Sequence, residues 1–391
     1  MDFSLSEKER AFQHRVRDLA RSQLAKGALL RAHSDDFPRE VMKMLVENGL
    51  IGITIPPEDG GQGGTLMEAV LAITGIAELC PRSADVVQAG NFGPIRVLSA
   101  FGTDDQKTRF LSKLLKGELL ITVAMSEPEA GSAVTDLETT ATPDGDGYRL
   151  NGTKVYTTNG LHADLFLTYV RYGPGLDGIG SVLIERGGEG FKTGTPSRFL
   201  SGEGWVEIQF EDLYVPPENV LLGPGGFKKQ ISGFNVERLG NAARSLGVGR
   251  CAFNLARDHA LKREQFGRPL CEFQGLQWKF ADSEVQLQAA ELLLHRAAVN
   301  ADAGFPSAFE TATAKVQCNT AGYQAADNAL QVMGGLGYSE ESLVEYCFRK
   351  TRGWMIAGGS IEMMKNRIAE TVFDRRFSQR PPRPKEQKAT S

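Results

Sequence analysis

The segment MSEPEAGSA, residues 125–133, and the segment KVYTTNG, residues 154–160, are the most informative stretches of this sequence. In the first segment Pro128 fixes one backbone dihedral, and Gly131 and Ser132 keep the side chains after it small. A ligand can therefore lie close to the main chain of this loop. The second segment has the composition of a strand. Together they predict a ligand-binding loop beside a strand.

The sequence before these segments is helical in pattern. Apolar residues such as Phe12, Val16 and Leu19 recur at helical spacing. Ser6 and Glu9 have the spacing of a capping box, which predicts where the first helix begins. This part of the chain is therefore expected to form an all-helical domain.

Around and after the two segments the pattern changes twice. Short β-rich runs such as LFLTYV and GSVLIE are separated by turns such as PDGDG, and helical periodicity then resumes. The predicted fold class is α+β, mostly α, with an N-terminal helical domain, a central β-barrel-like domain and a C-terminal four-helix bundle. The predicted boundaries are 1–117, 118–226 and 227–378 for these domains, and 379–391 for a Pro-rich, charged, mobile tail.

Composition excludes several classes of partner. The net charge of the 391 residues is only -4, and the basic residues are scattered, so nucleic acid is not expected as a partner. No apolar run has a membrane-spanning length, and the N-terminus lacks the pattern of a signal peptide, so a cytoplasmic protein without membrane association is expected. The five cysteines and five histidines have no metal-ligand spacing, so no metal is predicted.

The two opening segments resemble the flavin-contact motifs of the acyl-CoA dehydrogenase family, TEPGAGSD and WITNG. Further similar stretches follow in the family's order: PPEDGGQGG from Pro56, FEDLYVPPENVLLG from Phe210, KREQFGRPL from Lys262 and QVMGGLGYSEE from Gln331. The matches extend nearly from end to end. The resemblance implies the family's three-domain fold, FAD as the cofactor and a thioester as the substrate.

For the flavin ring, the resemblance implies contacts from the β domain. The hydroxyl of Ser126 or Thr158 near the ring edge would stabilise the charge that arrives with hydride, and Tyr156 would lie against one ring face. The positions carried over for the ring and its surroundings are Met125, Ser126, Gly131, Ser132, Tyr156, Thr158, Ser360 and Glu362.

Other matched positions correspond to the adenosine and pyrophosphate half of FAD. If residues 228–263 form one unbroken helix, Glu237 and Arg263 are separated by about 39 Å. One chain cannot easily serve both halves of one flavin across that distance. The family solves this with a neighbouring subunit, so we expect a homo-oligomer, built as a tetramer from dimers. The positions are Arg263, Gln265, Phe266, Gln274, Gln331 and Gly335.

The family's catalytic base is missing from its usual place. Aligning the family segment EGTSEIQRN with residues 358–366 puts Gly358 where the glutamate would stand. Its backbone N–H still suits an oxyanion contact. Some relatives supply the base from the long helix that opens the C-terminal domain, directly before an arginine, which predicts Glu237 as the general base. Glu362 is the weaker candidate.

Substrate contacts are also implied only by the resemblance. Arg238 matches a position that orients the base or the substrate, and a structural ion pair explains it equally well. Ser132 matches a residue near the thioester end of the substrate. Ala133 replaces the usual aspartate beside it, so either a CoA thioester or a carrier-protein thioester fits. Electron-transferring flavoprotein is expected as the redox partner.

Three hypotheses for function remain open. The first is an FAD-dependent acyl-CoA dehydrogenase with Glu237 as base. The second is a flavoenzyme of the same fold with other chemistry, a monooxygenase or an acyl-CoA desulfinase, and the missing glutamate at Gly358 favours it. The third is a non-catalytic subunit that binds a thioester, against which the intact flavin loop argues.

Overall fold

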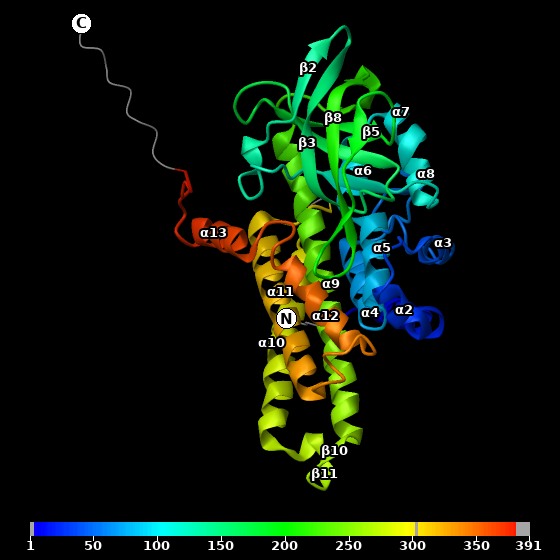
Figure 1. Ribbon diagram of the computed structural model, residues 1–391, viewed down its shortest axis with the longest axis vertical. Coiled ribbons are helices and arrows are strands. Elements are labelled where there is room, and N and C mark those ends of the chain that lie inside the picture. Colours follow the sequence, from blue (N-terminus) through cyan, green and yellow to red (C-terminus); the bar gives the residue numbers. More distant parts are fainter. Residues whose placement is uncertain (1–3, 302–303, 381–391) are drawn as a thin grey trace, which may run out of the picture.

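The structure is a computed structural model that describes residues 4–301 and 304–380. Helices are followed by a β-rich region and then by helices again. Figure 1 shows the sheet at one end of a long column of C-terminal helices, with the N-terminal helices along the side of that column. The predicted α+β class, mostly α, is confirmed. The predicted mobile tail falls mainly on residues 381–391, which lie outside the described residues.

The N-terminal helices pack around α4, which is buried along its whole length because it is apolar on every side. The predicted capping box of α1 is present, since Ser6 and Glu9 each accept a hydrogen bond from the other's backbone amide. The α-helices of this region are α1 (Glu7–Leu19), α2 (Ala28–Ala32), α3 (Arg39–Glu47), α4 (Leu66–Ala77), α5 (Pro81–Asn91), α6 (Pro94–Phe101), α7 (Asp104–Gln106) and α8 (Ser112–Leu115).

The β-rich region forms one mixed sheet with the strand order β6-β8-β3-β2-β4-β5-β9, in which β1 also pairs with β4 and β7 with β8. The long strands β3 and β8 run antiparallel in a register that pairs Thr158 with Trp205. The strands are β1 (Ile121–Ala124), β2 (Thr140–Asp144), β3 (Gly147–Thr158), β4 (Leu165–Arg171), β5 (Ile179–Glu185), β6 (Phe191–Thr193), β7 (Ser197–Arg198), β8 (Gly204–Val215) and β9 (Val220–Leu222).

The C-terminal helices pack closely because small residues meet between them. A Cβ atom added at Gly249 of α9 would lie 2.6 Å from the Cα of Gly322 of α11, so only glycine allows this approach. The expected unbroken helix is present as α9. The elements are α9 (Phe227–Lys262), a hairpin of β10 (Glu264–Gln265) and β11 (Arg268–Pro269), α10 (Gln274–Val299), α11 (Ala308–Met333), α12 (Leu343–Trp354) and α13 (Ile361–Val372).

Candidate active site

A buried ion pair fastens the loop of residues 125–133 to strand β3. The Oε1 of Glu127 lies 2.7 Å from the Nζ of Lys154, and both side chains are buried. The Glu127 carboxylate also accepts hydrogen bonds from backbone amides of the following segment. Lys154 donates a further bond to the carbonyl of Met125 at 3.3 Å. The loop is thus fixed from within by charged groups that do not face a ligand.

Strand β3 presents an exposed face beside this loop. Side chains alternate along a strand, so Tyr156 and Thr158 point to the open side while Thr157 points into the sheet. Tyr156 is 59% exposed, its ring centroid lies 4.8 Å from that of Trp205, and the ring of Phe199 is close to both. These rings form a continuous aromatic surface. Phe199 and Trp205 were not predicted as site residues.

The loop and this surface suit a flat aromatic cofactor such as a flavin. No atom of the described residues outside the local chain lies within 4 Å of a Cβ added at Gly131, so a cofactor can approach the main chain there. Gly131 and Ser132 are exposed, and Met125 and Ser126 are half-buried. The carbonyl of Ser126 accepts a bond from the Val155 amide at 2.9 Å, which holds the loop next to β3.

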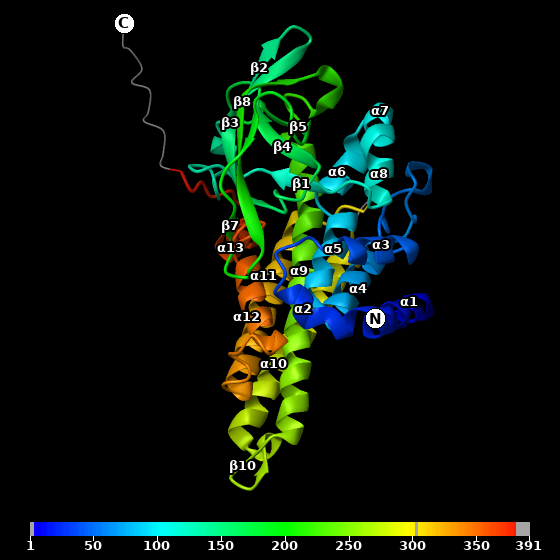
Figure 2. The same ribbon diagram turned by 45° about the vertical axis from the view of Figure 1, so that its right-hand side comes forward.

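The residues predicted for the distal half of FAD lie at the other end of the molecule. Arg263, Gln265 and Phe266 belong to the β10–β11 hairpin and the residue before it, which Figures 1 and 2 show at the far end of α9 from the sheet. Phe266 is 96% exposed. Gln274 begins α10 directly after this hairpin, Gln331 lies in the last turn of α11, and Gly335 follows that helix. Within one chain the two groups are not brought together.

Glu237 lies on α9 with its carboxyl turned toward α5. Its Oε2 accepts a hydrogen bond from the Nε2 of Gln88 at 2.6 Å, and its side chain is 19% exposed. A Cβ added at Gly93 would lie 2.5 Å from that Oε2. Burial raises the pKa of the Glu237 carboxyl, while Arg244 and the Gln88 hydrogen bond oppose the rise. A carboxyl of raised pKa in a confined place has the character of a general base.

Gly358 lies against the same helix. It has φ +74, and a Cβ added there would meet the Nδ2 of Asn241 at 2.6 Å, one turn along α9 from Glu237. The carbonyl of Gly358 accepts a 2.9 Å bond from the Nε of Arg238. Positions 237 and 358 therefore face one region. Arg238, predicted as a substrate contact, donates hydrogen bonds to this carbonyl and to the side chain of Asn235.

Glu362 has a different environment. It lies exposed in the first turn of α13, whose N-cap is Ser360. Hydrogen bonds from its own backbone N–H and from Ser360 lower the pKa of Glu362. A carboxyl of lowered pKa is a poor proton acceptor. The comparison of the two acids favours Glu237 as the base.

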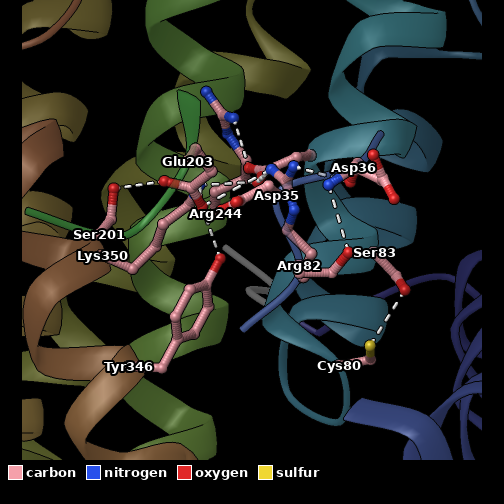
Figure 3. Close-up of polar contacts among 12 residues, drawn as sticks. Asp35, Asp36, Cys80, Arg82, Ser83, Ser201, Glu203, Arg244, Tyr346 and Lys350 are labelled. Atoms are coloured by element: carbon pink, nitrogen blue, oxygen red, sulfur yellow. Dashed lines mark hydrogen bonds and ion pairs between the residues drawn. The ribbon is translucent and has the colours of Figure 1, made fainter. Parts of the chain in front are cut away.

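Beside Glu237 lies a group of buried charges that the sequence did not reveal, shown in Figure 3. We call it the buried charge cluster, and Asp85 is its centre. The Asp85 carboxylate bonds Arg244 at 2.8 Å, Lys350 at 2.7 Å and Arg82 at 3.1 Å. Burial alone would raise the pKa of Asp85, but the neighbouring cations, led by Lys350, hold it far below its usual value. The members are Arg82, Asp85, Glu203, Arg244 and Lys350.

Glu203 ties the sheet to this cluster. It lies just before β8 and accepts hydrogen bonds from Lys350 at 2.5 Å and from the hydroxyl of Tyr346 at 2.7 Å, both on α12. Figure 2 shows the β7–β8 connection reaching down to α12. For the α5 members of the cluster, a signal was available in the sequence. Arg82, Asp85 and Gln88 recur at helical spacing within an otherwise small and apolar segment.

Comparison with known proteins gives one consistent family. Models of the acyl-CoA dehydrogenase N-terminal, middle and C-terminal domains match residues 6–118, 122–213 and 224–373. The chain is 33% identical to a 3-sulfinopropanoyl-CoA desulfinase of Paraburkholderia xenovorans, over 97% of this chain and 99% of that protein. It is 32% identical to a short-chain-specific acyl-CoA dehydrogenase of Clostridium acetobutylicum, over 95% and 100%.

A solved structure supports the same relationship. Butyryl-CoA dehydrogenase from Megasphaera elsdenii superposes with a TM-score of 0.89 and 30% identity, covering 95% of this chain and 100% of that one. The similarity therefore extends over the whole three-domain architecture. No helix among the described residues is long and apolar enough to cross a membrane.

Proposed function

Because the chain belongs to the acyl-CoA dehydrogenase family, we propose that it is an FAD-dependent acyl-CoA dehydrogenase in which Glu237 removes the α-proton. An oxidoreductase acting on acyl-CoA is the activity that the family carries. One observation, more than any other, supports Glu237 as the base. Gly358, which replaces the usual base, packs against α9 within one turn of Glu237, and the carboxyl of Glu237 has a raised pKa.

In this proposal each local feature has a task. Glu237 takes the proton from the carbon beside the thioester carbonyl, and Gln88 orients the carboxyl by its 2.6 Å hydrogen bond. The backbone N–H of Gly358 donates to the carbonyl oxygen as negative charge develops there. Arg238 fixes this backbone by binding the Gly358 carbonyl. Ser360 and Glu362 at the start of α13 lie close by in the chain.

FAD fits the loop and the aromatic surface, with Met125, Ser126, Gly131, Ser132, Tyr156 and Thr158 around its ring. Bound there, FAD supplies the acceptor for the hydride that leaves the β-carbon. We further propose that the distal half is held by Arg263, Gln265, Phe266, Gln274, Gln331 and Gly335 of a second copy, because these residues lie at the far end of α9. The assembly is then a homotetramer, and electron-transferring flavoprotein reoxidises it.

The test of the base is the variant Glu237→Gln. It should retain FAD, and its flavin bleaching by acyl-CoA should slow by about a hundredfold to ten-thousandfold, the usual contribution of a general base. The measurement is stopped-flow absorbance over a panel of acyl-CoA thioesters. Glu284→Gln, on α10 in an ion pair with Arg250, is the matched control. Undiminished bleaching by the Glu237 variant would remove this residue from the role.

A second candidate function is desulfination of a sulfinyl acyl-CoA thioester. Two observations favour it: the absence of a glutamate at position 358, and the similarity to the desulfinase of Paraburkholderia xenovorans. Cleavage of a carbon–sulfur bond needs no base at the α-carbon. Sulfite release that survives in the Glu237→Gln variant would select this chemistry over dehydrogenation. A purified protein that cannot be reconstituted with FAD would support the non-catalytic alternative.

A further inference from the structure

The space beside the proposed base is unusually rich in buried charge. Arg244 lies between Glu237 and the buried charge cluster, since its guanidinium is 3.8 Å from the Glu237 Oε1 and 2.8 Å from Asp85. Both Arg82 and Arg244 bind the Asp85 carboxylate, so two guanidinium groups converge on one point. The contact of α5 with α9 therefore places charged groups directly beside the proposed base.

These charges do not balance. In the cluster itself Arg82, Arg244 and Lys350 face the carboxylates of Asp85 and Glu203. Glu237 adds a third acid. Two more basic side chains lie near it, the half-buried Arg238 and the fully buried Lys315.

Neither of these two side chains forms an ion pair within the described part of the chain. Within residues 4–301 and 304–380, no carboxylate lies within 4.0 Å of the charged nitrogens of Arg238 or Lys315. The Nζ of Lys315 donates to the carbonyl of Trp354 at 2.8 Å, and Arg238 binds a carbonyl and an amide oxygen. The imbalance is therefore clearest in the cluster itself, where three cations face two carboxylates.

An excess of buried positive charge is unfavourable unless an anion balances it. Two independent observations agree. The Nε atoms of Arg82 and Arg244 are buried and have no hydrogen-bond partner in the described part of the chain. In addition, burial lowers the pKa of Lys315 to about 7, and the positive charges of Arg238 and Arg244 contribute to this shift.

We propose that the acyl group of the substrate is short and ends in an oxyanion, a carboxylate or a sulfur oxyanion, which binds at Arg82 and Arg244. The inference rests on the proposed function, which positions the thioester at Glu237. The chain is short because the Arg244 guanidinium lies only 3.8 Å from the Glu237 carboxylate. Charge-assisted bonds from two guanidinium groups suit the planar or forked oxygens of such a group.

An unsubstituted fatty acyl chain is a poor alternative occupant. The side chains of Gln88, Asn241 and Arg244 would face it, and burying them against methylene groups leaves polar atoms without partners. Arg244 also lies 5.0 Å from the ring centroid of Trp354, which supports the guanidinium from the other side. The residues around the site therefore select against an apolar chain.

The test uses CoA thioethers, which lack the carbonyl that acidifies the α-proton and so cannot be oxidised. S-carboxypropyl-CoA, S-sulfopropyl-CoA and neutral S-butyl-CoA are titrated into the holoenzyme by calorimetry. At least one anionic thioether should bind about tenfold to a hundredfold more tightly than the neutral one, as expected for charge-assisted hydrogen bonds. The two anionic ligands separate carboxylate from sulfur oxyanion recognition. Equal or tighter binding of S-butyl-CoA overturns the proposal.

A variant locates the site. Arg244→Gln should abolish most of the preference for the anionic thioether, whereas Arg250→Gln, on the same helix and paired with Glu284, should retain it. If Arg244→Gln still prefers the anionic thioether, the oxyanion does not bind at Arg244. Because binding of the thioethers requires no reduction of flavin, anion selectivity in a protein that fails to bleach would refute the proposed reaction and leave this inference standing.

Discussion

Two buried arrangements of charge flank the candidate site, and they differ in how completely they are balanced. At the flavin loop, Glu127 and Lys154 form a pair 2.7 Å apart, and backbone groups complete their hydrogen bonds. In the buried charge cluster, Asp85 and Glu203 face a larger number of cations, and guanidinium N–H groups stay unpaired among the described residues.

The difference separates a structural device from a binding device. A self-contained pair stabilises one loop geometry and offers nothing to a ligand, because each charge is already matched. An unbalanced cluster retains attraction for an anion from outside. The two arrangements should therefore respond in different ways to the same chemical change, the replacement of a buried cation by methionine.

The largest effect is expected for Lys154→Met. It leaves the buried carboxylate of Glu127 without its cation, which should lower the free energy of unfolding by about 3 to 5 kcal/mol and weaken FAD retention. Denaturant titration and the ratio of flavin to protein absorbance measure both. Lys192→Met removes a cation from an exposed pair with Glu211 and should cost about 1 kcal/mol or less.

If Lys154→Met does not fold, the double variant Glu127→Gln with Lys154→Met still tests the interpretation. It removes both charges, so no buried group stays unpaired, and it should recover part of the stability. If the double variant is no more stable than Lys154→Met alone, the loss of stability does not come from an unpaired Glu127 carboxylate.

How much of this could be predicted from the sequence depends on the range of the interactions. Local patterns were sufficient for the fold: the Ser6 and Glu9 capping box is present, and the long helix expected over residues 228–263 is α9, Phe227–Lys262. Both features are determined by residues within one element. The family resemblance likewise depends on contiguous motifs, and the domain models agree with it.

The buried charge cluster could not be predicted in the same way. It joins Arg82 on α5, Glu203 before β8 and Lys350 on α12, which meet only after the domains pack. A charged residue in a helix is usually exposed, and the helical spacing of Arg82 and Asp85 does not indicate which distant residues they will contact. Trp205 was missed for a similar reason, since its role depends on the register of β8 against β3. The roles assigned to the site residues stay predictions.

A smaller, pH-dependent effect is expected at Lys315. Its pKa falls from 10.5 in the unfolded chain to about 7 in the fold, so between these values the unfolded state binds more protons. Stability should then rise with pH across this window, by up to about 1.4 kcal/mol per pH unit. Denaturant titrations of Lys315→Met at several pH values should show a free energy of unfolding that rises less steeply with pH.

The comparison with the wild-type protein isolates the Lys315 contribution best between pH 7 and 8. Lys154 also has a lowered pKa, about 8, and it contributes a slope of the same sign at higher pH in both proteins. Parallel stability curves for the two proteins would contradict a lowered pKa of Lys315 in the folded protein.

The smallest effect is expected for Arg82→Met, although Arg82 is almost as deeply buried as Lys154. Its removal leaves Asp85 still bonded to Arg244 and Lys350, so no carboxylate loses its last cation. The cost in unfolding free energy should be about 1 kcal/mol, near that of an ordinary hydrogen bond, while the affinity for anionic thioethers falls. Denaturant titration and calorimetry measure these together. A loss of stability as large as that of Lys154→Met would mean that the cluster, like the pair, exists to hold the fold.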